Sequence, residues 1–204
     1  MRSHRVTMII AVASALAASP YVVGYAWAQA QDPAVRFIRD SAGALVAIAN
    51  GAGSSQEKHR QIAEVLDRSV DLEGIARSCL GRFWRTATQE QQLQYATLSR
   101  DLLVTKIADH IGEYHGVRLT MGAVRAGADG EIVATTVERP GAPADEVDWV
   151  VSNATSSPRI VDLLAEGTSM RQTQSSDFIA YLASHQYDIN NLIQGLRQKI
   201  AENK

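Results

Sequence analysis

The feature that most constrains the fold is a change in the period of the apolar residues at Gly116. Before this glycine, apolar residues recur every three or four positions, which is typical of amphipathic helices. After it, Val117, Leu119 and Met121 alternate with polar residues, which is typical of a strand with one buried face. A chain that groups its helices and strands in this way is expected to form an α+β fold.

Residues 32–115 are predicted to be helical. Asp32 offers a capping carboxylate and Pro33 fits the first turn of a helix, so a helix is expected to begin there. Thr88 is followed three residues later by a glutamine, which is the pattern of a capping box. This box predicts the start of a long helix over about residues 89–113.

Residues 117–166 are predicted to form a four-stranded antiparallel sheet. Asp129 and Gly130 give a strong hairpin signal between the first two strands. Further turn residues separate the third and fourth strands. Helical spacing returns over residues 169–202, so the expected fold has about six helices around the sheet.

The N-terminus has the pattern of a secretory signal. Two arginines precede an apolar stretch over residues 6–18, and small residues then stand at the spacing of a cleavage site. Cleavage is expected after Ala28, with Ala30 as the second choice, and an uncleaved anchor is the alternative. This divides the chain into a signal peptide, 1–28, and a single domain, 29–204.

The charge of the chain argues against a nucleic-acid partner. Removal of the signal peptide removes two arginines and no acid, which takes the net charge from −2 to −4. Binding to nucleic acid or to an anionic bilayer through a basic patch requires a cluster of Lys and Arg that this chain lacks. The one cysteine, Cys79, has apolar neighbours and is expected to be buried.

The sequence contains no pattern that predicts a catalytic or metal site. It lacks a P-loop, a nucleophile elbow and a His or Cys cluster with metal-ligand spacing. We therefore expect no cofactor, no metal and no catalytic residue. Asp162, in an apolar strand, is predicted to be a structural buried acid, because a buried carboxylate must be hydrogen-bonded or paired. A general base is the alternative reading of Asp162.

A short segment before the long helix carries two aromatic rings between two cations: Arg82, Phe83, Trp84 and Arg85. Arginine stems laid across aromatic rings are a common packing arrangement. The functional interpretation of the segment is a docking site for a partner or a portal for a ligand.

These residues resemble the MlaC family, the toluene-tolerance-type periplasmic phospholipid-binding components of an ABC transport system. The resemblance lies in the segment 77–92, in Asp148-Trp149, in Val161-Asp162 and in 166–169. The amino-acid sequence of residues 165–170 is similar to that of the hopanoid-associated branch called HpnM. One departure is Gln174-Ser175-Ser176, where the family often has arginine or Asn-Tyr-Arg, so no head-group role is carried over to it.

The resemblance implies a partly NTF2-like sheet wrapped by helices, with an apolar cavity that takes acyl chains. It implies a periplasmic carrier of a phospholipid or hopanoid-type lipid. It also implies transfer between membranes with an inner-membrane ABC transporter complex and an outer-membrane partner. The candidate cavity-lining residues are apolar positions of the long helix and the strands: Leu103, Ile107, Val117, Leu119, Met121, Ile132, Ala134, Val147, Trp149 and Val151.

Two other functions fit parts of the sequence. An NTF2-like enzyme of the isomerase type would use Asp162 as its base. A non-lipid adaptor of the cell envelope would have a filled core and would dock through the segment 82–85. The residues alone do not identify the lipid, the direction of transport or the oligomeric state.

Overall fold

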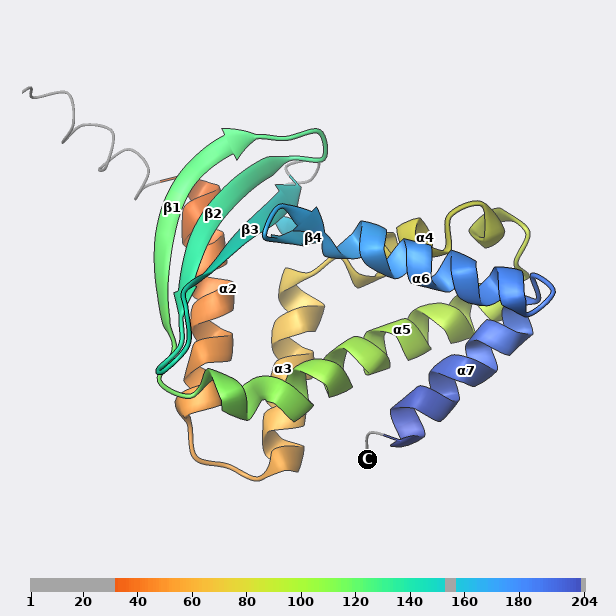
Figure 1. Ribbon diagram of the computed structural model, residues 1–204, viewed down its shortest axis with the longest axis horizontal. Helices are drawn as coiled ribbons and strands as arrows, with labels where there is room; N and C mark the ends of the chain where they lie inside the picture. Colours follow the sequence, from red (N-terminus) through yellow and green to blue (C-terminus); the bar gives the residue numbers. More distant parts are fainter. Residues whose placement is uncertain (1–31, 153–156, 203–204) are drawn as a thin grey trace, which may run out of the picture.

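The computed structural model describes residues 32–152 and 157–202, and the expected signal peptide with its cleavage site lies outside these residues. The described chain runs through helices, then an antiparallel sheet, then two more helices (Figure 1). This is the α+β order predicted from the change of period. None of the described helices is long and apolar enough to cross a membrane.

The described residues form six α-helices and two short 3-10 helices. Their bounds are α2 Pro33–Asn50, α3 Ser55–Ser69, α4 Leu72–Leu80, η1 Gly81–Arg85, α5 Gln89–His110, η2 Ile111–Tyr114, α6 Met170–Ser184 and α7 Ile189–Glu202.

Local capping explains why the helices begin where they do. The Asp32 carboxylate accepts a hydrogen bond of 2.8 Å from the backbone N–H of Ala34, and Pro33 is the first residue of α2. At α5, Thr88 and Gln91 each bond the other's backbone N–H, which makes the full capping box that the sequence predicts. The long helix ends at His110, three residues earlier than expected, because its last turn tightens into η2.

The sheet has five strands where four were predicted. The strands are β1 Arg118–Ala126, β2 Glu131–Glu138, β3 Asp145–Ser152, β4 Arg159–Ala165 and β5 Thr168–Ser169. They pair antiparallel in sequence order. The fifth strand follows a tight turn in which Glu166 and Gly167 both have positive φ angles, of 50° and 77°. A strand of two residues is too short to show an alternating pattern, so the sequence alone did not reveal it.

The helix α2 covers one face of the sheet. The apolar side of α2, with Val35 and Ile38, packs on Val133 of β2 and Val151 of β3, and all four side chains are buried. Figure 1 shows α2 running along the sheet while α4, α6 and α7 lie at the opposite end of the molecule.

The long helix α5 connects the two ends (Figure 1). Its N-terminal half packs with α4, α6 and α7 around Tyr95, Leu182 and Ile193. Its C-terminal half packs with α2 and α3 around Ile62 and Val104. The core therefore consists of three apolar clusters, and the third is the contact between α2 and the sheet.

Candidate functional site

An apolar cavity of about 370 Å³ lies where the three core clusters meet. This volume is within the usual range of ligand-binding cavities. Its walls come from five helices and two strands: Ser41, Ala42 and Leu45 of α2; Val65, Leu66 and Ser69 of α3; Val70; Leu72, Ile75, Ala76 and Cys79 of α4; Tyr95, Ser99, Arg100, Leu102, Leu103, Lys106 and Ile107 of α5; Trp149 of β3; Ile160, Asp162 and Leu163 of β4; and Met170, Arg171, Gln174 and Phe178 of α6.

The cavity is elongated along α5. Its lining residues on this helix run from Tyr95 to Ile107, which is about 18 Å at the rise of an α-helix. Among the lining residues only Lys106 and Met170 are exposed, so the cavity reaches the surface at these side chains. At the other end Tyr95, Phe178 and Cys79 are buried and close it.

Three cationic side chains line the cavity, and two of them are paired. Arg100 of α5 makes a two-pronged contact with Asp67 of α3, with nitrogen–oxygen distances of 2.7 and 2.6 Å. Arg171 pairs with Asp129 and lies 3.8 Å from the carboxylate of Asp162. Lys106 has no ion pair with any residue in 32–152 or 157–202, so its ammonium group is free to meet an anion at the opening.

The contact between Arg100 and Asp67 fixes one wall of the cavity. It joins α5 to α3 across 33 positions of sequence. The hydrogen bonds from Arg100 lower the pKa of the Asp67 carboxyl below its ordinary value, against a smaller opposing effect of burial. The ion pair is therefore present at neutral pH and holds the two helices at the cavity.

Three of the ten residues predicted to line a cavity lie on this one. Leu103 and Ile107 project from α5, and Trp149 projects from β3. The indole N–H of Trp149 donates a 2.9 Å hydrogen bond to the hydroxyl of Thr135, and this bond fixes the ring against the neighbouring strand.

The other seven predicted residues do not line this cavity. Ile132 and Ala134 pair with Val150 and Asp148, so they lie on the opposite face of the sheet from Trp149. Met121 and Val151 share the face of Trp149, but they pack with the helix α2. The remaining three are Val117, buried before β1, and Leu119 and Val147, half-buried in β1 and β3.

The register of the strands explains the difference. Because β1 and β2 are at the far edge of the sheet, the side chains of their inner face meet α2, and only β3 and β4 reach the cavity. The helices α3, α4 and α6 supply residues that the sequence analysis missed, such as Leu66, Ala76 and Phe178. Their only signal in the sequence was the apolar side of each helix, which predicts burial but not a cavity.

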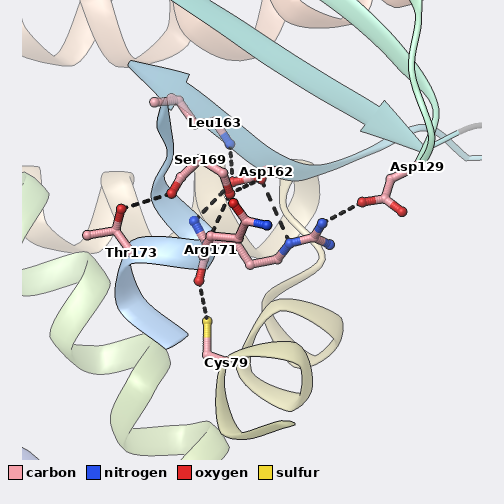
Figure 2. Close-up of polar contacts among 8 residues, drawn as sticks. Cys79, Asp129, Asp162, Leu163, Ser169, Arg171 and Thr173 are labelled. Carbon is pink, nitrogen blue, oxygen red and sulfur yellow. Dashed lines mark hydrogen bonds and ion pairs between the residues drawn. The ribbon is translucent and has the colours of Figure 1, made fainter. Parts of the chain in front are cut away.

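Asp162 is 6% exposed and stands at the centre of a polar network (Figure 2). Its Oδ1 accepts hydrogen bonds from the backbone N–H groups of Leu163, at 2.8 Å, and Arg171, at 3.0 Å. Its Oδ2 accepts a 2.5 Å hydrogen bond from the hydroxyl of Ser169. All of these donors belong to β4, β5 or the first turn of α6.

The network continues from Arg171 in two directions (Figure 2). The guanidinium group contacts Asp129 in the turn between β1 and β2. The backbone carbonyl accepts a 3.5 Å hydrogen bond from the thiol of Cys79 in α4. Since both oxygens of Asp162 are occupied by donors of its own chain, these contacts favour a structural anchor over a general base.

Cys79 is 2% exposed and lines the cavity. Burial is the main reason that the pKa of its thiol rises to about 11, partly opposed by the charge of Arg171. Burial also raises the pKa of the neighbouring Tyr95 above its ordinary value. Both groups are therefore neutral at physiological pH, which suits an apolar wall.

The segment 82–85 lies outside the cavity, in η1. Phe83 and Trp84 pack partly against the helical core, and the guanidinium group of Arg82 lies 4.9 Å from the centre of the Phe83 ring. Both arginines of the segment are exposed. The described residues contain no group of His, Cys, Asp and Glu side chains that would hold a metal ion.

An α+β fold with an apolar cavity between its sheet and helices defines a protein that binds an apolar or amphipathic molecule. Comparison with protein families makes the assignment specific: the family model described as MlaC protein matches residues 41–198. The chain belongs to the MlaC family, which confirms the resemblance seen in the sequence. No curated protein matches the sequence at a significant level.

A solved structure has the same fold. It is described as the phospholipid-binding protein from Ralstonia solanacearum in complex with a phospholipid. The two folds superpose with a TM-score of 0.72 over 84% of this chain and 99% of the other, at 22% sequence identity. The match shows that the arrangement of sheet and helices is shared.

Proposed function

We propose that this protein is a periplasmic carrier that binds the acyl chains of a phospholipid, or the apolar body of a hopanoid-type lipid, in the cavity. The observation that carries the proposal is a large apolar cavity in a member of the MlaC family. The phospholipid in the structurally similar Ralstonia solanacearum protein supports the class of ligand.

The lining of the cavity supports a ligand with an apolar body. Most of the lining side chains are apolar. Apolar surface that leaves water contributes about 25 cal/mol per Å², so an apolar chain that enters the cavity is bound favourably.

The free energy of transfer from water explains why such a lipid needs a carrier. Each methylene that leaves water contributes about 0.8 kcal/mol, so two chains of about 15 methylenes would contribute about 24 kcal/mol. A lipid with this preference for apolar surroundings does not cross an aqueous compartment by itself. The carrier has to offer comparable burial, and it needs no nucleophile or metal to do so.

The position of Lys106 supports an anionic head group at the opening. Its exposed ammonium group lies on the rim, one helical turn from the apolar lining residues Leu102 and Leu103. A lipid whose chains follow α5 inward would leave its phosphate near this cation. Family membership supports a periplasmic location and delivery to an inner-membrane ABC transporter complex, with an outer-membrane protein as the other partner.

The proposal is tested by the lipid that accompanies the protein. The full chain, purified from a bacterial periplasm without detergent, is extracted with organic solvent and the extract is analysed by mass spectrometry. We expect close to one phospholipid or hopanoid-type lipid per protein. An Ala76→Phe variant, whose ring enters the cavity, should carry much less. Equal lipid in the two proteins, or none in either, would overturn the proposal.

The alternative functions predict different outcomes. An isomerase-type enzyme would lose turnover in Asp162→Asn while it kept its fold and its bound ligand. A non-lipid adaptor would contain no extractable lipid. The lipid measurement therefore separates the carrier from the adaptor and identifies the lipid class, and the turnover of Asp162→Asn separates the carrier from the enzyme.

A further inference from the structure

A second hollow, of about 380 Å³, lies on the surface at η1 and shares no lining residue with the apolar cavity. It is lined by Arg77, Gly81, Arg82, Trp84 and Arg85. Figure 1 places η1, which follows α4, at the end of the molecule away from the sheet. The hollow is thus separate from the proposed lipid site.

The three arginines of the hollow are exposed, and none of them pairs with a carboxylate among the residues that the structure describes. Arg60, Arg100, Arg118, Arg125, Arg139 and Arg171 each have an acidic partner within 4 Å. Other described arginines, such as Arg36 and Arg39, also have no acidic partner, but only Arg77, Arg82 and Arg85 line one hollow together. Three like charges around one hollow repel each other unless an anion lies between them. The arrangement is therefore complementary to a negatively charged group.

Aromatic rings hold two of the guanidinium groups in place. Arg77 lies 6.0 Å from the centre of the Trp84 ring, and Arg82 lies 4.9 Å from that of Phe83. Phe83 in turn stacks on Tyr187 with ring centres 5.8 Å apart. Guanidinium groups fixed in this way lose little freedom on binding, and their planar donors match a carboxylate or phosphate.

Gly81 gives the hollow its backbone shape. It has a φ of 56° and a ψ of −127°, a conformation that other residues rarely adopt, and it ends α4 directly before Arg82. The turn separates η1 from α4, and Arg82 and Arg85 of η1 line the hollow together with Arg77 of α4.

We propose that this hollow docks a protein partner of the carrier by receiving an Asp or Glu side chain between Arg77, Arg82 and Arg85. Trp84 also borders a neighbouring groove that contains Leu93, whose exposed fraction is 70%. Arginine and tryptophan are enriched among the residues that supply most of the binding energy in protein interfaces.

An anionic membrane fits the hollow less well than an acidic protein segment does. Attraction to a bilayer depends on the summed charge within about a Debye length of its surface. The exposed acid Glu73 lines the neighbouring groove that Trp84 shares with the hollow, and the chain is acidic as a whole. A single carboxylate inside the hollow interacts mainly with the three guanidinium groups. The inference rests on the proposed function, because a carrier has to dock where it delivers its lipid.

The test is site-specific photo-cross-linking in cells of the source bacterium. A photoreactive amino acid replaces Thr86, which is exposed beside the hollow. We expect a cross-linked envelope protein whose attached peptide contains Asp or Glu. The yield should fall at least tenfold in Arg82→Glu/Arg85→Glu. Exchange of the partner's acid for arginine should restore it.

A matched control uses the same charge change elsewhere. Arg36 and Arg39 are exposed on α2 and have the same spacing, so Arg36→Glu/Arg39→Glu should leave the cross-link unchanged. An undiminished cross-link in the first variant, no cross-linked protein at all, or failure of the charge exchange would overturn the inference. Flotation with phosphatidylglycerol vesicles that depends on Arg82 and Arg85 would also overturn it, in favour of a membrane.

Lipid content and thermal unfolding are measured on the same purified proteins. The arginine variant should keep its lipid and its melting temperature, since none of the changed residues lines the cavity. If the unmodified protein carries no lipid, the proposed function fails, whereas the cross-linking result for the docking site still stands or falls by itself.

Discussion

The carboxylate of Asp162 and the backbone N–H of Arg171, nine residues apart, are joined by a 3.0 Å hydrogen bond that ties β4 to the first turn of α6. Arg171 also contacts Asp129 in the hairpin turn and Cys79 in α4. One short segment thus connects the sheet to two helices that wall the cavity.

Replacement of Asp162 by asparagine should destabilise the protein without abolishing its lipid binding. The amide would keep one acceptor oxygen and would lose the one that serves either Ser169 or the backbone N–H groups. A buried group left without its partner costs about 1–3 kcal/mol, so we expect a loss of this size in the free energy of unfolding. Urea unfolding measures it. Asp177→Asn, at an exposed acid of α6, is the control and should change little.

A bulky side chain placed inside the cavity should displace the lipid and leave the fold intact. Leu103→Trp adds volume to a wall that borders empty space, so it should not overpack the core. We expect at least a several-fold fall in co-purified lipid, with the secondary structure retained in circular dichroism. Ala180→Trp, on an exposed part of α6, is the control. A filled variant that still carries a full complement of lipid would show that the ligand binds elsewhere.

Removal of the charge of Lys106 should weaken the binding of anionic phospholipids. Lys106→Gln keeps a flexible polar side chain, one atom shorter, but removes the free cation at the opening. Exposed ion pairs contribute about 0.2–1 kcal/mol, so the affinity for phosphatidylglycerol should fall by a factor between about 1.4 and about 5 at low salt. A fluorescent-lipid displacement assay measures this. Lys199→Gln on α7 should have no effect, and a salt-independent loss would contradict the electrostatic explanation.

The ion pair between Arg100 and Asp67 should make part of the stability depend on pH. The pKa of Asp67 is lowered in the folded protein, mainly by its hydrogen bonds with Arg100. This contribution is complete above the unfolded pKa of about 3.9 and is lost as the pH falls toward the lower folded value. Between pH 5 and pH 3 the unmodified protein should therefore lose slightly more stability than Asp67→Asn. Thermal unfolding at low salt measures the difference, and parallel curves would contradict it.

The thiol of Cys79 should react slowly with alkylating reagents. With a pKa of about 11, only about one thiol in a thousand is ionised at pH 8, and the sulfur is also buried. Reaction with iodoacetamide followed by mass spectrometry should show little modification of the native protein and rapid modification in denaturant. Rapid labelling of the native protein would mean that the cavity opens readily as far as α4.

The α+β class could be predicted from the sequence because this fold class depends on local patterns of residues. The period changes at Gly116, and the caps at Asp32 and Thr88 act within a few residues. These features can therefore be recognised in the sequence before the fold is known. The fifth strand was missed because two residues cannot display a period. The hopanoid-associated branch remains a prediction.

Only some of the residues that line the cavity could be predicted from the sequence, and the reason is physical. Leu103, Ile107 and Trp149 could be chosen because a long helix and a central strand were expected to face each other. Ile132 and Ala134 lie on the other face of the sheet, because one step along a strand moves a side chain to the other face. Whether Lys106 has an ion pair depends on which charged side chains lie near it in the fold. The spacing of residues along the chain does not give this information.

The order of helices and strands, the caps that start the helices and the motifs of the MlaC family can all be found in the amino-acid sequence. The tertiary structure decided that three apolar clusters meet without closing the space between them, and that Arg77, Arg82 and Arg85 gather around one hollow. Apolar residues signal burial whether they fill a core or line a cavity. Only the distances between residues far apart in the chain separate these two outcomes.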